Sequence, residues 1–178
     1  IGFLFGCTIA IVYQRKKPSL QKLRPQDPFH KLSPQDPSYL EDKMWYEAEL
    51  DFLFKFNENL ASAHSFQGVA QCITEAAHNF LPIERTVLLT WDRNSEKFTL
   101  ICAIGWHYDR NKNFLTIGKD SVSGFVVSRR EELVVSDLTQ DHYLNRLNKE
   151  EHFLRKAFIS IPLIYKEEVL GVLHVCDK

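Results

Sequence analysis

The second half of the chain is a series of short apolar runs separated by brief polar turns, and this spacing constrains the fold more than any other feature of the sequence. Strands joined by short turns pair antiparallel, because a parallel pair needs a crossover of about a dozen residues or more. Six strands are therefore expected, at residues 86–91, 98–106, 114–117, 133–136, 157–165 and 169–176. A short helix is expected at 121–130, and residues 137–154 should be loop and short helix.

Two helical segments precede these strands. From residue 39 to residue 64, apolar residues recur every three or four positions with acidic residues mostly between them, which predicts a long amphipathic helix. Ser65 is suited to cap a second helix that runs to Phe80 and ends before Pro82. The expected fold class is α+β, a six-stranded antiparallel sheet with helices on one face and loops and short helices on the other.

The helix expected at 39–64 has two interpretations. Its N-terminal half can form a parallel coiled coil with a second copy, which would make the protein a homodimer, while its C-terminal half lies on the domain. Alternatively, its whole apolar stripe covers the core of its own domain. The heptad pattern is too short to decide between the two.

Residues 1–13 are uncharged and mostly apolar, which predicts the C-terminal part of a transmembrane helix. They would form roughly 20 Å of helix, against the roughly 30 Å of a bilayer core, so we expect the rest of the span upstream of Ile1. A signal peptide would carry its positive charge before the apolar run, whereas the basic cluster here follows it, from Arg15 to Arg24. The positive-inside rule then predicts a single-pass anchor in the inner (plasma) membrane, with everything after Gln14 cytoplasmic.

Residues 14–38 contain five of the seven prolines and are expected to form an extended juxtamembrane linker. The chain begins without a methionine and stops directly after an apolar strand, so we expect it to be a fragment of a longer protein.

The composition excludes several classes of function. A net charge of −1 gives no reason to expect a nucleic-acid partner. The four cysteines fit neither a zinc site nor a disulfide framework and are expected to be reduced thiols. No Walker loop, His-Glu-x-x-His motif or Gly-x-Ser-x-Gly elbow is present, so no catalytic residue and no metal ligand is predicted.

The order of motifs from about Leu53 to Cys176 resembles a GAF domain, a cytoplasmic small-molecule sensor module. The resemblance rests on residues 83–89, 117–127, 133–138, 160–163 and 170–173. The closing turn lacks the glycine often seen there, and the family's C-terminal helix is absent before Lys178. The resemblance implies that residues 65–178 are a sensor domain with a small-molecule ligand between the sheet and its irregular cover.

Alternation along the second strand predicts one shared face for Phe98, Leu100, Cys102, Ile104 and Trp106. In the last strand the same rule groups Leu170, Val172, His174 and Cys176.

Ser160 and His174 are polar groups in otherwise apolar strands, so they are expected to point toward the covered cavity. The pocket candidates, including those implied by the resemblance, are Cys102, Ile104, Trp106, Phe125, Ser136, Asp137, His142, Tyr143, Ser160 and His174. The alternative is that the polar ones lie on an exposed strand face or in ordinary turns.

The ligand stays unknown at this point. Bilin-binding relatives need a cysteine before the fifth strand, and residues 148–156 contain none, so a bilin is not expected. A haem is not supported either, because a lone histidine is usually structural or exposed. Asp177 and Lys178 stand where cyclic-nucleotide-binding relatives begin an Asn-Lys-Phe-Asp-Glu signature, with Asp in place of Asn.

The resemblance implies a ligand-sensing and dimerising regulatory module of a membrane-anchored, bacterial signal transduction protein. It would relay the ligand state to an output domain beyond residue 178, such as a histidine kinase or a diguanylate cyclase, and the residues present are not expected to form an enzyme. Two alternatives are a free methionine sulfoxide reductase-like enzyme, with Cys102 and Cys176 close across the sheet, and a ligand-free dimerisation spacer.

Overall fold

The computed structural model describes residues 37–80, 83–106, 116–148 and 151–177. The expected membrane segment 1–13 and nearly all of the linker 14–38 lie outside these ranges. Among the helices of the described ranges, none is both long enough and apolar enough to cross a membrane. The chain separates into two units, one ending at Ser62 and the other comprising Ala63–Lys178.

The first unit contributes helix α2, Pro37–Ser62, which begins two residues before the expected start. Proline is well tolerated in the first turn of a helix, where its missing N–H would have no partner. Tyr46, Leu50 and Phe54 are each about two-thirds exposed and follow one another at four-residue spacing along α2. Met44, expected in the buried stripe, is also exposed. The helix is therefore apolar on more than one side.

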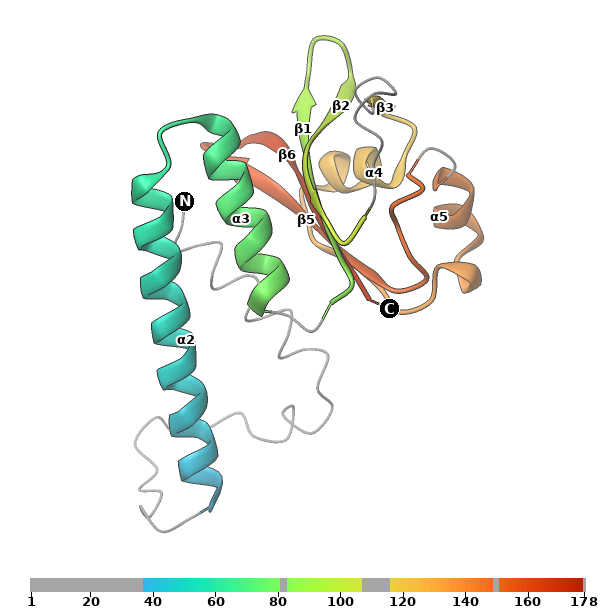
Figure 1. Ribbon diagram of the computed structural model, residues 1–178. Coiled ribbons are helices and arrows are strands. Elements are labelled where there is room, and N and C mark those ends of the chain that lie inside the picture. The colour runs from blue at the N-terminus through green and yellow to red at the C-terminus, as the bar shows by residue number, and fades with distance from the viewer. Residues whose placement is uncertain (1–36, 81–82, 107–115, 149–150, 178) are drawn as a thin grey trace. The chain divides into compact units, whose positions relative to one another are not determined.

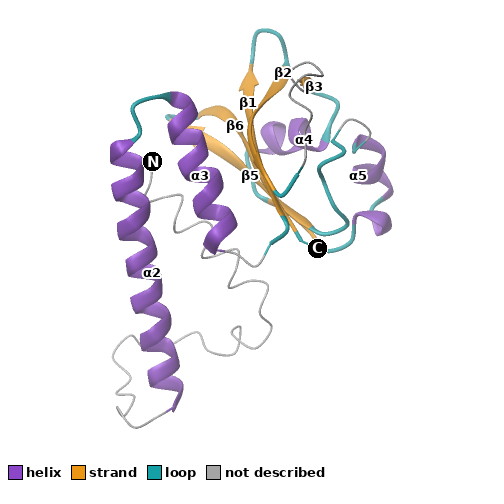
Figure 2. Cartoon of the chain, viewed as in Figure 1, coloured by secondary structure: helices purple, strands orange, loops and turns teal. Residues whose placement is uncertain are grey.

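The second unit is an α+β domain built on one sheet, as predicted. Its strands lie in the order β3-β2-β1-β6-β5-β4, and every neighbouring pair is antiparallel. Figure 2 shows β1, β2, β5 and β6 of this sheet in orange. The elements are α3 (Phe66–Phe80), β1 (Arg85–Asp92), β2 (Lys97–Ile104), β3 (Thr116–Gly118), α4 (Val122–Arg129), β4 (Leu133–Val135), the 3-10 turn η1 (Leu138–Gln140), α5 (His142–Leu147), β5 (Phe158–Tyr165) and β6 (Glu168–Cys176).

The two faces of the sheet are covered by different elements. Helix α3 packs on β1, β2 and β6, whereas α4 packs on β5 and β6 from the opposite side. Figure 1 shows α3 on one side of the sheet and α4 and α5 on the other. The Ser65 hydroxyl accepts the Gly68 N–H at 3.0 Å, so Ser65 caps α3 as the sequence predicts.

A β-bulge in β2 makes the predicted face wrong for Cys102 and Ile104, whereas Trp106, beyond the end of the strand, packs on the same core as Phe98 and Leu100. Leu88 of β1 pairs with Cys102, but the next residue, Leu89, pairs with Leu100, so Ile101 is an extra residue. One extra residue reverses the alternation of the side chains in the rest of that strand.

The bulge decides which face each β2 side chain joins. Phe98 and Leu100 pack into the core beneath α4. Cys102 is the partner of Leu88, and Ile104 is the partner of Thr86, so both lie on the α3 face. A second bulge makes Leu170 of β6 the extra residue, and its side chain is 46% exposed rather than aligned with His174.

Beneath α4, where the sequence predicts a covered cavity, lie large buried side chains of the described residues. Phe153, Phe158 and His174 have no exposed surface there. The Phe153 ring lies 5.2 Å from the His174 ring and 5.5 Å, edge-on, from the Trp106 ring, centroid to centroid. The described side chains therefore pack against one another beneath α4.

Candidate functional site

Four fully buried polar side chains form one hydrogen-bonded chain beneath α4. Ser160 of β5 and His174 of β6 are a cross-strand pair, and the Ser160 Oγ lies 2.7 Å from the His174 Nδ1. On the other side of the ring, the His174 Nε2 lies 2.8 Å from the Oγ of Ser123, near the start of α4. The Ser123 hydroxyl in turn donates to the carboxylate of Glu151.

The Glu151 carboxylate satisfies the first amides of α4. One oxygen accepts the Val122 N–H at 2.7 Å, and the other accepts the Ser123 N–H at 3.0 Å. The Ser121 hydroxyl accepts the next amide, that of Gly124, at 3.1 Å. The first-turn amides of a helix have no partner within the helix, and the positive end of the helix dipole favours an anion there. Glu151 therefore supplies both the acceptors and the charge that α4 needs.

The donor and the acceptor in each of these hydrogen bonds can be assigned by starting from the Glu151 carboxylate, which can only accept. Because the Ser123 hydroxyl donates to Glu151, it accepts from the Nε2–H of His174. The Nδ1 of His174 then accepts the Ser160 hydroxyl, which makes the imidazole neutral. Burial lowers the pKa of His174 to about 3, in agreement with a neutral ring.

This arrangement is not a nucleophilic triad. In such a triad the histidine lies between the serine and the carboxylate, so that it can take the proton of the serine. Here the serine lies between the histidine and the carboxylate, and all three side chains are inaccessible to solvent. The geometry holds structure together and does not activate the serine.

Asp137 forms local turn contacts, which was the alternative interpretation of this residue. Its carboxylate accepts the side-chain hydroxyl and the N–H of Thr139, and Lys156 lies 3.0 Å away. The Thr139 hydroxyl, with further help from Lys156, lowers the pKa of Asp137 to about 2. Ser136 and His142, also candidates, have exposed side chains.

The two cysteines of the reductase alternative lie on opposite faces of the sheet. Cys102 is on the α3 face, whereas Cys176 is buried in the core beneath α4. Burial raises the pKa of the Cys176 thiol to about 11, so it is protonated at neutral pH. The expectation that the two thiols lie close together is wrong.

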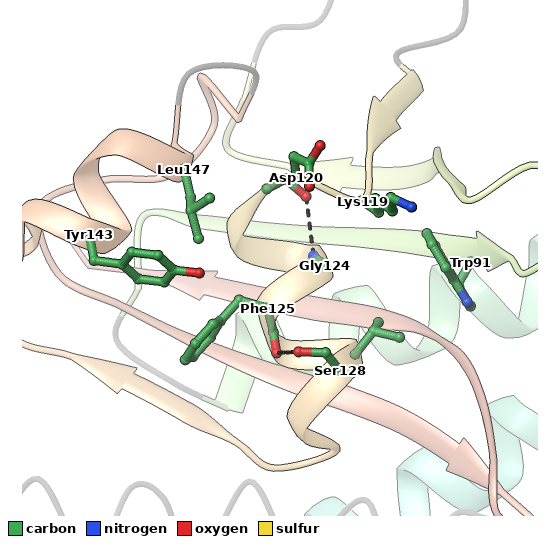
Figure 3. Close-up of a pocket in the computed structure, with 10 residues that line it drawn as sticks. Trp91, Lys119, Asp120, Gly124, Phe125, Ser128, Tyr143 and Leu147 are labelled. Carbon is green, nitrogen blue, oxygen red and sulfur yellow. Dashed lines mark hydrogen bonds between the residues drawn. The ribbon is translucent and has the colours of Figure 1, made fainter.

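An open groove of about 350 Å³ runs along the outer side of α4. Figure 3 shows the Tyr143 side chain reaching from α5 toward Phe125 of α4, with Trp91 of β1 at the other end. The Phe125 and Tyr143 rings meet edge to face at 5.9 Å between centroids. The groove is lined by Trp91, Lys119, Asp120, Ser121, Gly124, Phe125, Val127, Ser128, Tyr143 and Leu147.

Of the sequence candidates, Phe125 and Tyr143 line this groove and the other eight do not. Trp91, Lys119 and Asp120 are not among the pocket candidates from the sequence, although residues 117–127 carry part of the GAF resemblance. The nearest signal was Gly124 itself, because a side chain there would collide with the turn that carries Lys119.

The groove combines aromatic walls with charges at its rim. The guanidinium of Arg129 lies over the Phe125 ring at 5.1 Å, and that of Arg146 lies over the Tyr143 ring at 5.7 Å. Lys119 pairs with Glu96 at 2.6 Å. Such a surface suits a small amphipathic molecule with a flat apolar part. Within the described ranges, no group of His, Cys, Asp and Glu side chains is arranged to hold a metal ion.

A family model described as "GAF domain" matches residues 65–178. A GAF domain from an Acinetobacter phosphoenolpyruvate-protein phosphotransferase is similar in structure, with a TM-score of 0.60, 16% identity, and coverage of 72% of this chain and 76% of that one. Residues 122 to 287 of a methyl-accepting chemotaxis protein are similar at a TM-score of 0.61, 19% identity, and coverage of 71% and 82%.

A free methionine-R-sulfoxide reductase from Neisseria meningitidis is also similar, with a TM-score of 0.55, 15% identity and 68% coverage of both chains. None of the curated proteins matches this chain. At these identities the solved structures share the fold, and they do not carry a ligand or a reaction over to this chain.

Proposed function

Because the chain belongs to the GAF domain family, we propose that Ala63–Lys178 is a regulatory module that responds to a small molecule bound in the groove along α4. The groove is the observation that carries the proposal. Its volume of about 350 Å³ falls within the roughly 300–1,000 Å³ of small-molecule sites, and aromatic rings stand at both ends.

Helix α4 connects the groove with the interior of the domain. Its outward side presents Phe125 and Ser128 to the groove, while its inward side holds Ser123 against His174 of β6. A ligand that fixes the outward side of α4 would therefore also bias the contacts of the last strand, after which any output domain would follow. We propose that this output is a signalling enzyme such as a histidine kinase or a diguanylate cyclase. An open reading frame without such a domain beyond residue 178 would contradict this part.

The groove predicts a specific pattern of ligand stabilisation. In a thermal-shift screen of nucleotides, amino acids and organic acids, at least one compound should stabilise the protein, by about 2.7 kcal/mol at 100 times its Kd. Phe125→Ala and Tyr143→Ala should each weaken its Kd by about tenfold, because each removes an aromatic wall. Tyr165→Ala, a change of a half-exposed tyrosine on β5 outside the groove, is the control and should keep the full shift.

Two outcomes would argue against this assignment. If no compound stabilises the protein, the module is better described as a ligand-free dimerisation spacer. If a compound stabilises all three variants as it does the parent chain, a sensor remains but the groove is not its site.

We also propose that α2 pairs with its counterpart in a second copy. The exposed stripe of Tyr46, Leu50 and Phe54 supports this, since large apolar side chains repeated on one side of a helix favour association. Leu50→Glu and Phe54→Glu should each convert a dimer into a monomer in analytical ultracentrifugation. Asn59→Glu adds the same charge on another side of α2 and should leave the dimer intact. A monomeric parent chain, or a dimer that tolerates both stripe variants, would refute this seam.

Finally, we propose that residues 1–13 end a single-pass helix in the inner membrane and that the domain is cytoplasmic. The support is the uncharged run and the basic cluster directly after it. The full-length protein should stay with the membrane fraction after an alkaline carbonate wash. Recovery in the supernatant would contradict the anchor.

A further inference from the structure

We propose that Glu151 is an internal latch. Its carboxylate is the anion bound at the start of α4. When the carboxylate leaves this position, α4 and residues 151–154 are released together from the β5–β6 hairpin. Glu151 has no exposed surface, and three donors of α4 bind it: the Val122 N–H, the Ser123 N–H and the Ser123 hydroxyl. The contact joins parts of the chain that are 28 and 29 residues apart.

The segment that carries Glu151 also packs through apolar side chains. Phe153 and Leu154 are buried in the core beneath α4, and the Leu154 N–H donates to the Glu151 carbonyl at 2.9 Å. Apolar packing depends little on direction, whereas the carboxylate fixes the segment at one position on α4. Residues 151–154 and α4 are therefore expected to hold or release each other as one cooperative unit.

Several buried groups also depend on the Glu151 carboxylate for their hydrogen bonds. Without the carboxylate, the Val122 and Ser123 amides would be buried without their acceptors. The Ser123 hydroxyl would lose the acceptor that orients it. The hydrogen bonds from Ser123 to His174 and from His174 to Ser160 would then no longer have a fixed donor and acceptor. A buried donor left without an acceptor strongly favours opening to water. Release of Glu151 should thus loosen α4, residues 151–154 and the His174 region of β6 together.

The latch needs no ligand to exist, and only its trigger rests on the proposed function. Phe125 on the outer side of α4 lines the groove, so an occupied groove would reach the latch through α4. Both experiments below use the protein without ligand. A metabolite screen without a stabilising compound would not contradict the latch. A result that refutes the latch would not contradict ligand binding in the groove.

The first experiment measures hydrogen exchange by mass spectrometry on the full chain. Glu151→Gln keeps the shape of the side chain but removes the charge and one acceptor. Amides of residues 122–129, 151–154 and 172–176 should then exchange about tenfold faster or more, while those of α3 and the β1–β2 hairpin keep their rates. The control is Glu131→Gln, at an exposed acid after α4, which should change nothing. Unchanged exchange in Glu151→Gln, or equal acceleration throughout the sheet, would overturn the latch.

The second experiment tests whether a carboxylate is the bound group. Glu151→Ala should lower the Tm on the order of 10 °C, and added formate or acetate should restore at least half of that loss. Sodium chloride at equal ionic strength should restore much less. Equal effects of chloride and carboxylates, or an unchanged Tm in the variant, would overturn the proposal. If Glu151→Ala does not fold, the exchange pattern of Glu151→Gln decides.

Discussion

Gly124→Ala is expected to destabilise the domain by about 3 kcal/mol or more, a large share of the 5–15 kcal/mol that holds a typical domain folded. An ideal Cβ at Gly124 would lie 1.7 Å from the carbonyl oxygen of Lys119 and 2.6 Å from its carbonyl carbon. Both atoms belong to the backbone of the turn before α4, so no side-chain rotation relieves the contact. The Gly124 N–H also donates to Ser121, and moving the helix away from the turn would stretch this cap. Urea unfolding at neutral pH would measure the loss.

Gly68→Ala is the matched control, because it makes the same change in the first turn of a helix. The nearest atom to a Cβ at Gly68 is the Ser65 hydroxyl at 3.3 Å, which has room to shift slightly. The higher helix propensity of alanine works against this small disturbance of the cap, so the net change should stay below about 1 kcal/mol. If the two substitutions have similar effects, the close approach of the 119 carbonyl is not what shapes the turn.

The order of elements and the antiparallel sheet could be predicted because the sequence marks them locally. Ser65 and Ser121 stand before α3 and α4, Pro82 follows α3, and polar residues separate the apolar runs. These residues act through backbone geometry and capping, which depend on near neighbours. Element boundaries therefore agree with the expected ones to within about two residues for most elements.

The face of β2 could not be predicted, because the bulge leaves no mark in the sequence. Residues 100–104 read Leu-Ile-Cys-Ala-Ile, so every position is apolar and the alternation does not show where one residue is added. The bulge arises from pairing with β1, which is a tertiary property. For the same reason Cys102 was placed on the wrong side of the sheet.

Two of the four residues in the buried polar chain could be predicted from the sequence. Ser160 and His174 stand out as polar residues in apolar strands, and the rule that buried polar groups need partners applied to both. Their partners did not stand out, since Ser123 looks like an ordinary helix residue. Glu151 follows Lys149 and Glu150 in what reads as a charged surface loop. Only the folded chain shows that this one carboxylate turns inward.

His174 should make the domain less stable as the pH falls below about 6.5. Burial lowers the pKa of its imidazole to about 3, while the unfolded chain has a value near 6.5. Between these two values the unfolded chain binds a proton that the native protein does not. The free energy of unfolding therefore falls by up to about 1.4 kcal/mol for each pH unit, and above pH 6.5 this group has no further effect. At pH 5 the loss should be about 2 kcal/mol.

His174→Gln isolates this effect, because glutamine keeps a donor and an acceptor but does not titrate. The variant should be less stable than the parent chain at pH 7.5, and the difference in unfolding free energy should shrink by about 2 kcal/mol by pH 5. The other six histidines are present in both chains and cancel in the difference. Asp137, whose pKa is lowered to about 2, changes its contribution only near pH 4 and below. If the difference in unfolding free energy between the two chains stays constant from pH 7.5 to pH 5, the native imidazole binds a proton as readily as the unfolded one. The hydrogen-bond directions assigned from Ser160 to Glu151 would then be wrong.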